Sequence, residues 1–158
     1  MKEINLEKVI SEVERLCIEA NYFLDVKIMD RLKTAFDTEV SDTGKNILGQ
    51  IIENDEIAGK EQVPMCQDTG LTVVFLEVGK MVKINGDIYE AVNEGVRRGY
   101  KNGYLRKSMV KHPLDRINTQ DNKPAVIHTR LIPGSDKLKI IVAPKGGGSE
   151  NMSMVKML

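Results

Sequence analysis

The spacing of the apolar residues changes near residue 62, and no other feature of the sequence constrains the fold as strongly. Before that point apolar residues recur every three or four positions, which is the pattern of amphipathic helices. The run LTVVFLEVG at residues 71–79 then gathers β-branched and aromatic residues in a short stretch, which predicts a buried strand. We therefore predict an α+β fold, with residues 1–62 mainly helical and residues 63–158 of mixed α/β structure.

A single domain is predicted over residues 1–158, because a chain of 158 residues with 41% hydrophobic residues can bury a core of its own. Three helices are expected in its first part: one after the N-cap residue Asn5, one over about residues 25–36, and one after Ser41. The side chains expected to face inward on these helices are Leu6, Val9, Ile10, Val13, Leu16, Cys17, Ala20, Ile28, Met29, Leu32, Ala35, Ile47, Leu48, Ile51 and Ile52.

Further elements are expected in the second part. The segment IYEAVNEGVRRGYKNG, residues 88–103, predicts a helix that ends at a glycine. The runs at residues 125–132 and 137–144 flank the turn sequence PGSD and predict a β-hairpin. A last helix is expected after the cap residue Ser149. It is unfinished at Leu158, which suggests a fragment of a longer chain.

Composition excludes several classes of protein. Lysine plus arginine and aspartate plus glutamate both number 23, so the net charge is zero and a general nucleic-acid surface is not expected. The chain has no apolar run of about 18 residues and its start is charged throughout, so neither a membrane span nor a signal peptide is expected. Its two cysteines are far apart in sequence, which argues against a disulfide framework and predicts a reducing, cytoplasmic setting.

The segment VPMCQDTG, residues 63–70, is the first candidate site. A thiolate at Cys66 can bind a metal or attack an electrophile, while Gln67 can donate a hydrogen bond and Asp68 can transfer a proton. No second cysteine or histidine lies at the short spacing of a zinc site, and a nucleophilic cysteine would need one of the chain's two histidines as its base. A plain turn, in which Asp68 and Thr69 bond the backbone, is the open alternative.

Two more segments are candidate sites. Arg106, in the sequence LRKSMV, offers a guanidinium whose parallel donors fit a carboxylate, although most arginines are simply solvated. The segment KGGGSEN, residues 145–151, lets a ligand approach the backbone and offers N–H groups to an anion. It lacks the spacing of a nucleotide-binding fingerprint, and a flexible lead into a capped helix is the alternative.

In this order, the segments PMCQDTG, LRKSMVKHPLDRINTQDNKPAVIH and PKGGGSENMS resemble the α-subunit side of the class I iron–sulfur fumarate hydratases. The related α chains of L-tartrate dehydratases carry the same segments, and the resemblance covers essentially the whole chain. It implies a hydro-lyase subunit that interconverts L-malate and fumarate, a step of the tricarboxylic acid cycle. The alternatives are L-tartrate dehydration, a cluster-free scaffold fragment without catalysis, and an enzyme with a cysteine nucleophile.

The resemblance also implies roles for individual residues. Cys66 would be one of three cysteine ligands of a [4Fe–4S] cluster, whose other ligands would lie in a continuation of the chain. Gln67 and Asp68 would line the substrate pocket, and Asp68 would be the catalytic acid. Arg106 would bind a substrate carboxylate, and the backbone of Gly147 or Gly148 would approach the substrate.

The implied partners are a small dicarboxylate substrate and a β subunit, in an oligomer of α and β chains, with no nucleic acid and no membrane. The catalytic base would come from the β side, so the isolated chain is expected to be inactive. The sequence departs from the family pattern in one loop. Gln120 stands where an NTGDN-like sequence has glycine. Lys107 and Lys111 also differ from the family pattern, at positions close to Arg106.

Overall fold

The computed structural model describes residues 1–148 and 154–157, and it confirms the predicted α+β class. The chain divides into two compact units, which we call the helical unit (Glu19–Cys66) and the sheet unit (Met1–Ile18 with Gln67–Leu158). The single domain expected from the sequence stays a prediction. In the part of the chain that the structure describes, no helix is long and apolar enough to cross a membrane.

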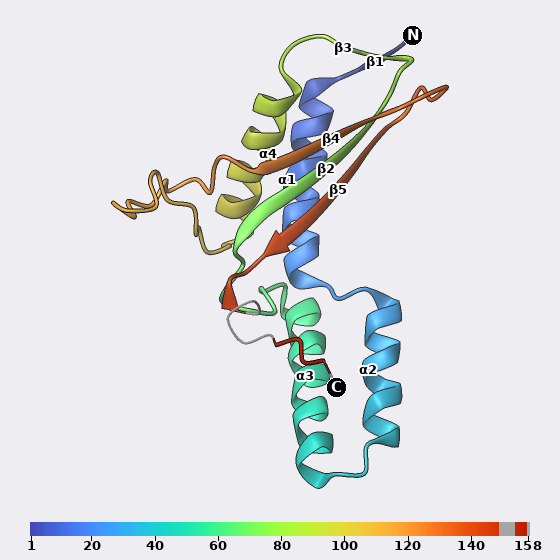
Figure 1. Ribbon diagram of the computed structural model, residues 1–158, viewed down its shortest axis with the longest axis vertical. Coiled ribbons are helices and arrows are strands. Elements are labelled where there is room, and N and C mark those ends of the chain that lie inside the picture. Colours follow the sequence, from blue (N-terminus) through green and yellow to red (C-terminus); the bar gives the residue numbers. More distant parts are fainter. Residues whose placement is uncertain (149–153, 158) are drawn as a thin grey trace. The chain divides into compact units, whose positions relative to one another are not determined.

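The sheet unit is built on the strands β2 (Leu71–Gly79), β4 (Val126–Ile132) and β5 (Leu138–Lys145). β2 lies between the other two, parallel to β4 and antiparallel to β5 (Figure 1). Alternate residues of β2, including Thr72, Val74 and Leu76, are buried, and the residues between them are partly or fully exposed. The strand predicted at residues 71–79 is therefore confirmed, with one face of the sheet turned to the core.

The predicted hairpin is wrong, because β2 is inserted between β4 and β5 and these two strands do not pair. The turn that joins them bonds instead to the end of β2. Gly79 N–H donates to Lys137 O and Met81 N–H donates to Ser135 O, both at 2.9 Å. The turn sequence PGSD specifies that the chain reverses, but it does not specify which strand fills the space between the two arms.

Two helices cover the buried face of the sheet. α1 (Leu6–Tyr22) starts as predicted, since Asn5 Oδ1 accepts from Glu7 N–H at 2.8 Å. α4 (Ile88–Asn102) also starts and ends as predicted, between its cap residues Asp87 and Gly103. Figure 1 shows both helices behind the sheet, and the hydrogen bond of 2.9 Å between Tyr89 Oη and Thr129 Oγ1 ties α4 to β4. A short parallel sheet of β1 (Lys2–Ile4) and β3 (Val82–Ile84) was not predicted.

Glycines let α1 and α4 approach closely. A Cβ atom at Gly95 would lie 2.6 Å from Val13 Cβ, and one at Gly99 would lie 2.8 Å from Cys17 Cβ, so larger residues would push the helices apart. The residues with the lowest exposure in the resulting core are Val13, Cys17, Thr72, Val74, Leu76, Val92, Val96, Tyr100, Leu105 and Asn122.

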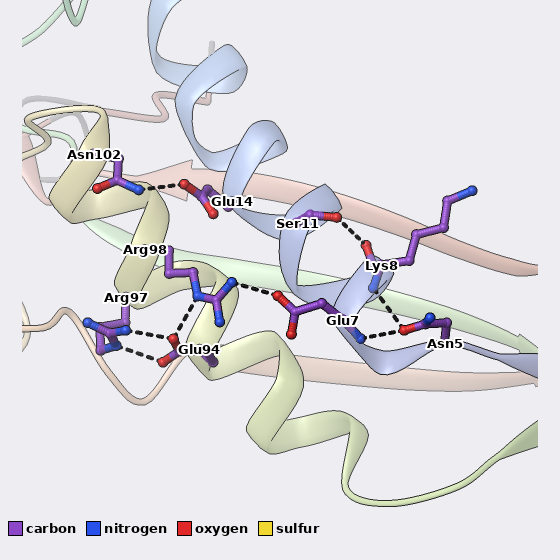
Figure 2. Close-up of polar contacts among 9 residues, drawn as sticks. All are labelled: Asn5, Glu7, Lys8, Ser11, Glu14, Glu94, Arg97, Arg98 and Asn102. Atoms are coloured by element: carbon purple, nitrogen blue, oxygen red, sulfur yellow. Dashed lines mark hydrogen bonds and ion pairs between the residues drawn. The ribbon is translucent and has the colours of Figure 1, made fainter.

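Polar pairs close the rim of this helix contact (Figure 2). Arg98 Nη1 donates to Glu7 Oε1 of α1 at 2.8 Å, and Arg98 Nε donates to Glu94 Oε1 at 2.7 Å. Arg97 donates twice to the same Glu94 carboxylate, at 2.6 Å. These hydrogen bonds, first from Arg97 and then from Arg98, lower the pKa of Glu94 to about 2.

The helical unit contains α2 (Val26–Thr38) and α3 (Asp42–Glu61), with the N-caps Asp25 and Ser41. The two helix starts are confirmed, but half of the eight side chains predicted to face inward are exposed and the other half are only partly buried. α2 has no buried residue, Ala58 is the buried residue of α3, and Ile28 is 51% exposed. The pattern defined an apolar face, and two paired helices do not supply enough surface to cover it.

The helix predicted after Ser149 is wrong where it can be checked. Residues 154–157 have no helical conformation, and Val155 is 93% exposed. A short helix is marginal unless an apolar face packs on something, and Val155 packs on little. The remainder of this predicted helix, residues 149–153 and 158, lies outside the described residues.

Candidate functional site

The segment before Cys66 is fixed by hydrogen bonds to the Met65 backbone within the helical unit. Met65 N–H donates to Asn21 O at 2.9 Å, and Asn54 Nδ2 donates to Met65 O at 2.9 Å. Cys66 follows directly and its side chain is exposed. An exposed thiol after an anchored backbone is suited to bind a metal or to react with an electrophile.

Asp68 lies against the glycine segment, which we call the glycine loop (residues 146–148). Asp68 Oδ2 accepts from Gly147 N–H at 3.1 Å and from Gly148 N–H at 3.4 Å. A Cβ atom at Gly146 would lie 2.9 Å from the same oxygen, so the loop could not come this close with a larger residue there. The structure therefore joins two of the predicted segments through one carboxylate.

The start of β2 also requires a glycine. Gly70 has φ +62°, and a Cβ atom there would overlap the carbonyl group of Lys145 at the end of β5. Since β5 leads directly into the glycine loop, this close approach keeps the glycine loop beside residues 67–70. An alanine at Gly70 would displace the two segments that share the Asp68 carboxylate.

The segment that carries Arg106, which we call the arginine loop (residues 104–125), is tied to the same place. Thr69 Oγ1 donates to Arg106 O at 2.8 Å, and Thr69 is 2% exposed. The Arg106 side chain itself is exposed and available to a ligand. The three predicted segments therefore meet in the sheet unit, although they are separated by up to 80 residues in sequence.

Sequence reasoning missed two buried polar residues that support this meeting point. Tyr100 Oη donates to Thr69 O at 2.8 Å and to Gly70 O at 3.3 Å, and burial raises the pKa of Tyr100 to about 12. Asn122, in the arginine loop, is fully buried and bonds both Gly70 and, within its own loop, Ser108. Asn122 lies in the NTQDN segment, so its polar side chain beside a predicted strand was the available signal.

The departure at Gln120 has a conformational explanation. Gln120 has φ +68°, in the left-handed region that glycine adopts without strain. The glycine of the family pattern fits that backbone directly. Here the turn is supported instead by Asn118 Oδ1, which accepts from Gln120 N–H at 2.7 Å.

The two histidines have local roles. His128 stacks on Phe75, with ring centroids 5.1 Å apart, and His112 Nδ1 accepts from Leu114 N–H at 3.2 Å. These contacts do not involve Cys66, so the geometry gives no support to a cysteine–histidine pair.

The residues fit one corner of an iron–sulfur cluster. Cys66 offers an exposed thiol, whereas burial, and then Glu14, raise the pKa of Cys17 to about 12. The chain has two cysteines, and among residues 1–148 and 154–157 no group of three or more His, Cys, Asp or Glu side chains could hold a metal ion. A cluster with three cysteine ligands would therefore take two of them from outside this chain.

Comparisons with known proteins identify the family of the chain. A family model described as fumarate hydratase (fumerase) matches residues 10–158. A Methanocaldococcus jannaschii protein, provisionally named L(+)-tartrate dehydratase subunit alpha, is 40% identical over 157 residues, covering 96% of this chain and 55% of that protein. The anaerobic class I fumarate hydratase of Escherichia coli is 36% identical over 118 residues, covering 73% of this chain and 21% of that enzyme.

The L(+)-tartrate dehydratase subunit alpha of Escherichia coli is 26% identical over 155 residues. That match covers 94% of this chain and 51% of that subunit. The chain therefore spans about half the length of the α-subunit relatives that it matches.

Proposed function

The chain belongs to the fumarate hydratase family, and from this premise we propose that it is the N-terminal part of the α subunit of a hydro-lyase that interconverts L-malate and fumarate. The observation that carries the proposal is the meeting of three segments. Asp68 is bonded by the glycine loop, and the residue after Asp68 is bonded to Arg106.

Dehydration of malate breaks a C–O bond and a C–H bond, so it needs an acid for the departing hydroxyl group and a base for the carbon-bound proton. Asp68 is the proposed acid: its carboxyl group gives a proton to the hydroxyl, which leaves as water, and takes one from water in the reverse reaction. The two glycine N–H groups hold that carboxyl in a fixed orientation. The base is proposed to come from the β subunit.

Arg106 is the proposed partner of a substrate carboxylate, because its guanidinium presents two parallel donors and its side chain is exposed. Gln67, also exposed, is proposed to bond a hydroxyl or a carboxylate oxygen of the same substrate. The backbone of Gly147 or Gly148 is proposed to approach the same substrate.

Cys66 is the proposed ligand of a [4Fe–4S] cluster from this chain. When bound, such a cluster supplies a Lewis acid for the substrate hydroxyl group. Loss of iron and acid-labile sulfide from a Cys66→Ser variant, with both retained in Cys17→Ser, would support this role. Equal cluster content in the two variants would contradict it.

The proposed partners are a small dicarboxylate and a β subunit, in an oligomer of both chains within a reducing, cytoplasmic compartment. The names of two relatives as α subunits support a second subunit. The same relatives favour L-tartrate dehydratase as a second candidate, since their α subunits match this chain over nearly all of its residues.

The test is turnover by the complete enzyme, prepared without oxygen, with L-malate, fumarate and L-tartrate as parallel substrates. Fast interconversion of malate and fumarate with slow tartrate dehydration supports the main proposal, and the reverse preference supports the second candidate. An Asp68→Asn variant keeps the shape of the side chain and removes the acid, so we expect turnover to fall by about a hundredfold or more while the cluster stays bound. Activity on none of the three substrates, in a sample that contains iron and sulfide, would refute both candidates.

A further inference from the structure

Asn122 is a buried side chain with three hydrogen bonds to backbone groups of two different loops. Its Oδ1 accepts from Ser108 N–H at 2.7 Å and from Met109 N–H at 3.1 Å, and its Nδ2 donates to Gly70 O at 3.2 Å. The residue is 0% exposed, and its backbone has φ +60°, which asparagine tolerates better than most residues.

The bonded groups lie next to the proposed site residues. Ser108 is two residues after Arg106, and Gly70 is two residues after Asp68. The Asn122 carboxamide therefore joins the backbone that carries the guanidinium to the backbone that carries the carboxyl. Thr69 Oγ1, bonded to Arg106 O at 2.8 Å, is a second link between the same two segments.

Tyr100 fixes the other side of this junction. Its hydroxyl bonds the carbonyl oxygens of Thr69 and Gly70 from α4, whose residues are packed into the core. Gly70 O thus receives one donor from a rigid helix and one from Asn122. Because Tyr100 holds the Asp68 side, loss of the Asn122 donor would move the arginine loop relative to a fixed partner.

We propose that Asn122 is a positioning residue that sets the placement of Arg106 relative to Asp68. The catalytic consequence rests on the proposed function: a dicarboxylate must meet the guanidinium and the acid at the same time. If the two groups are misaligned, a substrate held by Arg106 still binds but presents its hydroxyl badly to Asp68, so turnover falls more than binding does.

Asn122→Asp is the sharpest test, with Asn118→Asp as its matched control. The aspartate keeps the size of the side chain and an acceptor for Ser108 and Met109, but it loses the donor to Gly70 O. Asn118 sits in the same loop, and its Nδ2 donates to Lys107 O at 2.8 Å, so its bonds stay within the arginine loop. The two variants make the same chemical change, at a fully buried and at a partly buried position, and only Asn122→Asp cuts the link to Gly70.

In the complete enzyme, Asn122→Asp should lower kcat by about a hundredfold with KM changed by less than about threefold, as expected for a misplacement of roughly 1 Å. Asn118→Asp should leave both constants within about threefold. Hydrogen exchange supplies a readout without turnover in Asn122→Ala, which removes the acceptor as well as the donor: the amides of Ser108 and Met109 should exchange faster, while those of β2 and α4 stay protected.

Equal kinetic constants in the two variants would overturn the proposal, as would faster exchange spread over β2 and α4. If the unmodified enzyme dehydrates none of the substrates, the proposed function fails, and the exchange result alone still decides whether Asn122 holds the arginine loop. If Asn122→Asp does not fold, Thr69→Val and Thr69→Ser test the same junction. Thr69→Val should lower kcat, whereas Thr69→Ser, which keeps the hydroxyl donor, should have nearly the kcat of the unmodified enzyme. Equal kcat values in the two variants would overturn the proposal.

Discussion

The helical unit and the sheet unit carry similar amphipathic helices but bury them very differently. In the sheet unit, α4 buries residues along its whole length, including Ala91, Val92 and Val96, whereas α2 in the helical unit buries none. In both helices the spacing of the apolar residues indicates which face is apolar. Burial depends on a second surface of matching shape, which the sheet and α1 supply for α4.

The same difference bears on the proposed site. Its predicted residues divide at the boundary of the units, since Cys66 ends the helical unit and Gln67 begins the sheet unit. Asp68, Arg106 and the glycine loop are joined by hydrogen bonds above a packed core, while Cys66 is exposed. The sheet unit therefore holds the proposed acid Asp68 and the proposed carboxylate partner Arg106 in place, and four measurements compare the two units.

The largest expected difference is between the two thiols. Because burial raises the pKa of Cys17 to about 12, its thiolate fraction near pH 8 is on the order of one in ten thousand. A small alkylating reagent should therefore label Cys66 more than about a thousandfold faster than Cys17, as followed by mass spectrometry. Both cysteines should react at similar rates after denaturation, and similar rates in the folded protein would break the comparison.

The packing of the two units can be compared by truncating one leucine in each. Leu76 on β2 is 0% exposed, so Leu76→Ala should lower the free energy of unfolding by about 2–5 kcal/mol. Leu32 lies on α2, which has no buried residue, and Leu32→Ala should cost about 1 kcal/mol or less. Denaturant unfolding measures both, and equal losses would show that the helical unit is packed as well as the sheet unit.

The helix contacts of the two units can be compared by adding a methyl group at one glycine in each. A methyl group at Gly95 would lie 2.6 Å from Val13 Cβ and 2.8 Å from Ile10 O, so Gly95→Ala should destabilise the protein by about 1–3 kcal/mol. A methyl group at Gly49 of α3 would lie 3.2 Å from the Phe36 ring, which can shift. Gly49→Ala should therefore stabilise by about 0.5–1 kcal/mol through helix propensity. The same sign of change at both positions would contradict the assigned contacts.

The smallest expected difference between the units is in the stability that their ion pairs contribute. The pKa of Glu94 is lowered to about 2, so its ion pairs stabilise the fold above its usual pKa and this contribution is lost as the pH falls toward about 2. Glu94→Gln should lower the unfolding free energy at neutral pH by less than about 1 kcal/mol, and the difference should vanish in acid. Glu56→Gln, which removes a more exposed pair with Lys33, should change little at any pH.

Local chemistry made much of this fold predictable. The cap Asn5, the helix starts near Asp25 and after Ser41, and the strand at residues 71–79 depend on neighbouring residues alone, and all were predicted correctly. The strand order β4-β2-β5 was missed because it depends on pairing across long stretches of sequence, which a turn sequence does not encode.

The site shows the same limit. The residue types of its three segments were visible in the sequence, and resemblance supplied their proposed roles. The bonds from Gly147 to Asp68 and from Asn122 to Gly70 join residues at least 52 positions apart, so no local pattern could reveal them. A buried asparagine with left-handed φ is recognisable only once its three partners are in place.

The most direct test of the account is whether Asp68 holds the glycine loop. In selectively glycine-labelled protein, Asp68→Ala removes the oxygen that accepts from Gly147 and Gly148 N–H, so their amide proton signals should both move to lower frequency and their amides should exchange faster. Gly134, in an exposed turn where an added Cβ atom would meet nothing within 4 Å, is the internal reference and should not change. Unchanged signals at Gly147 and Gly148 would contradict the claim that the three segments form one site.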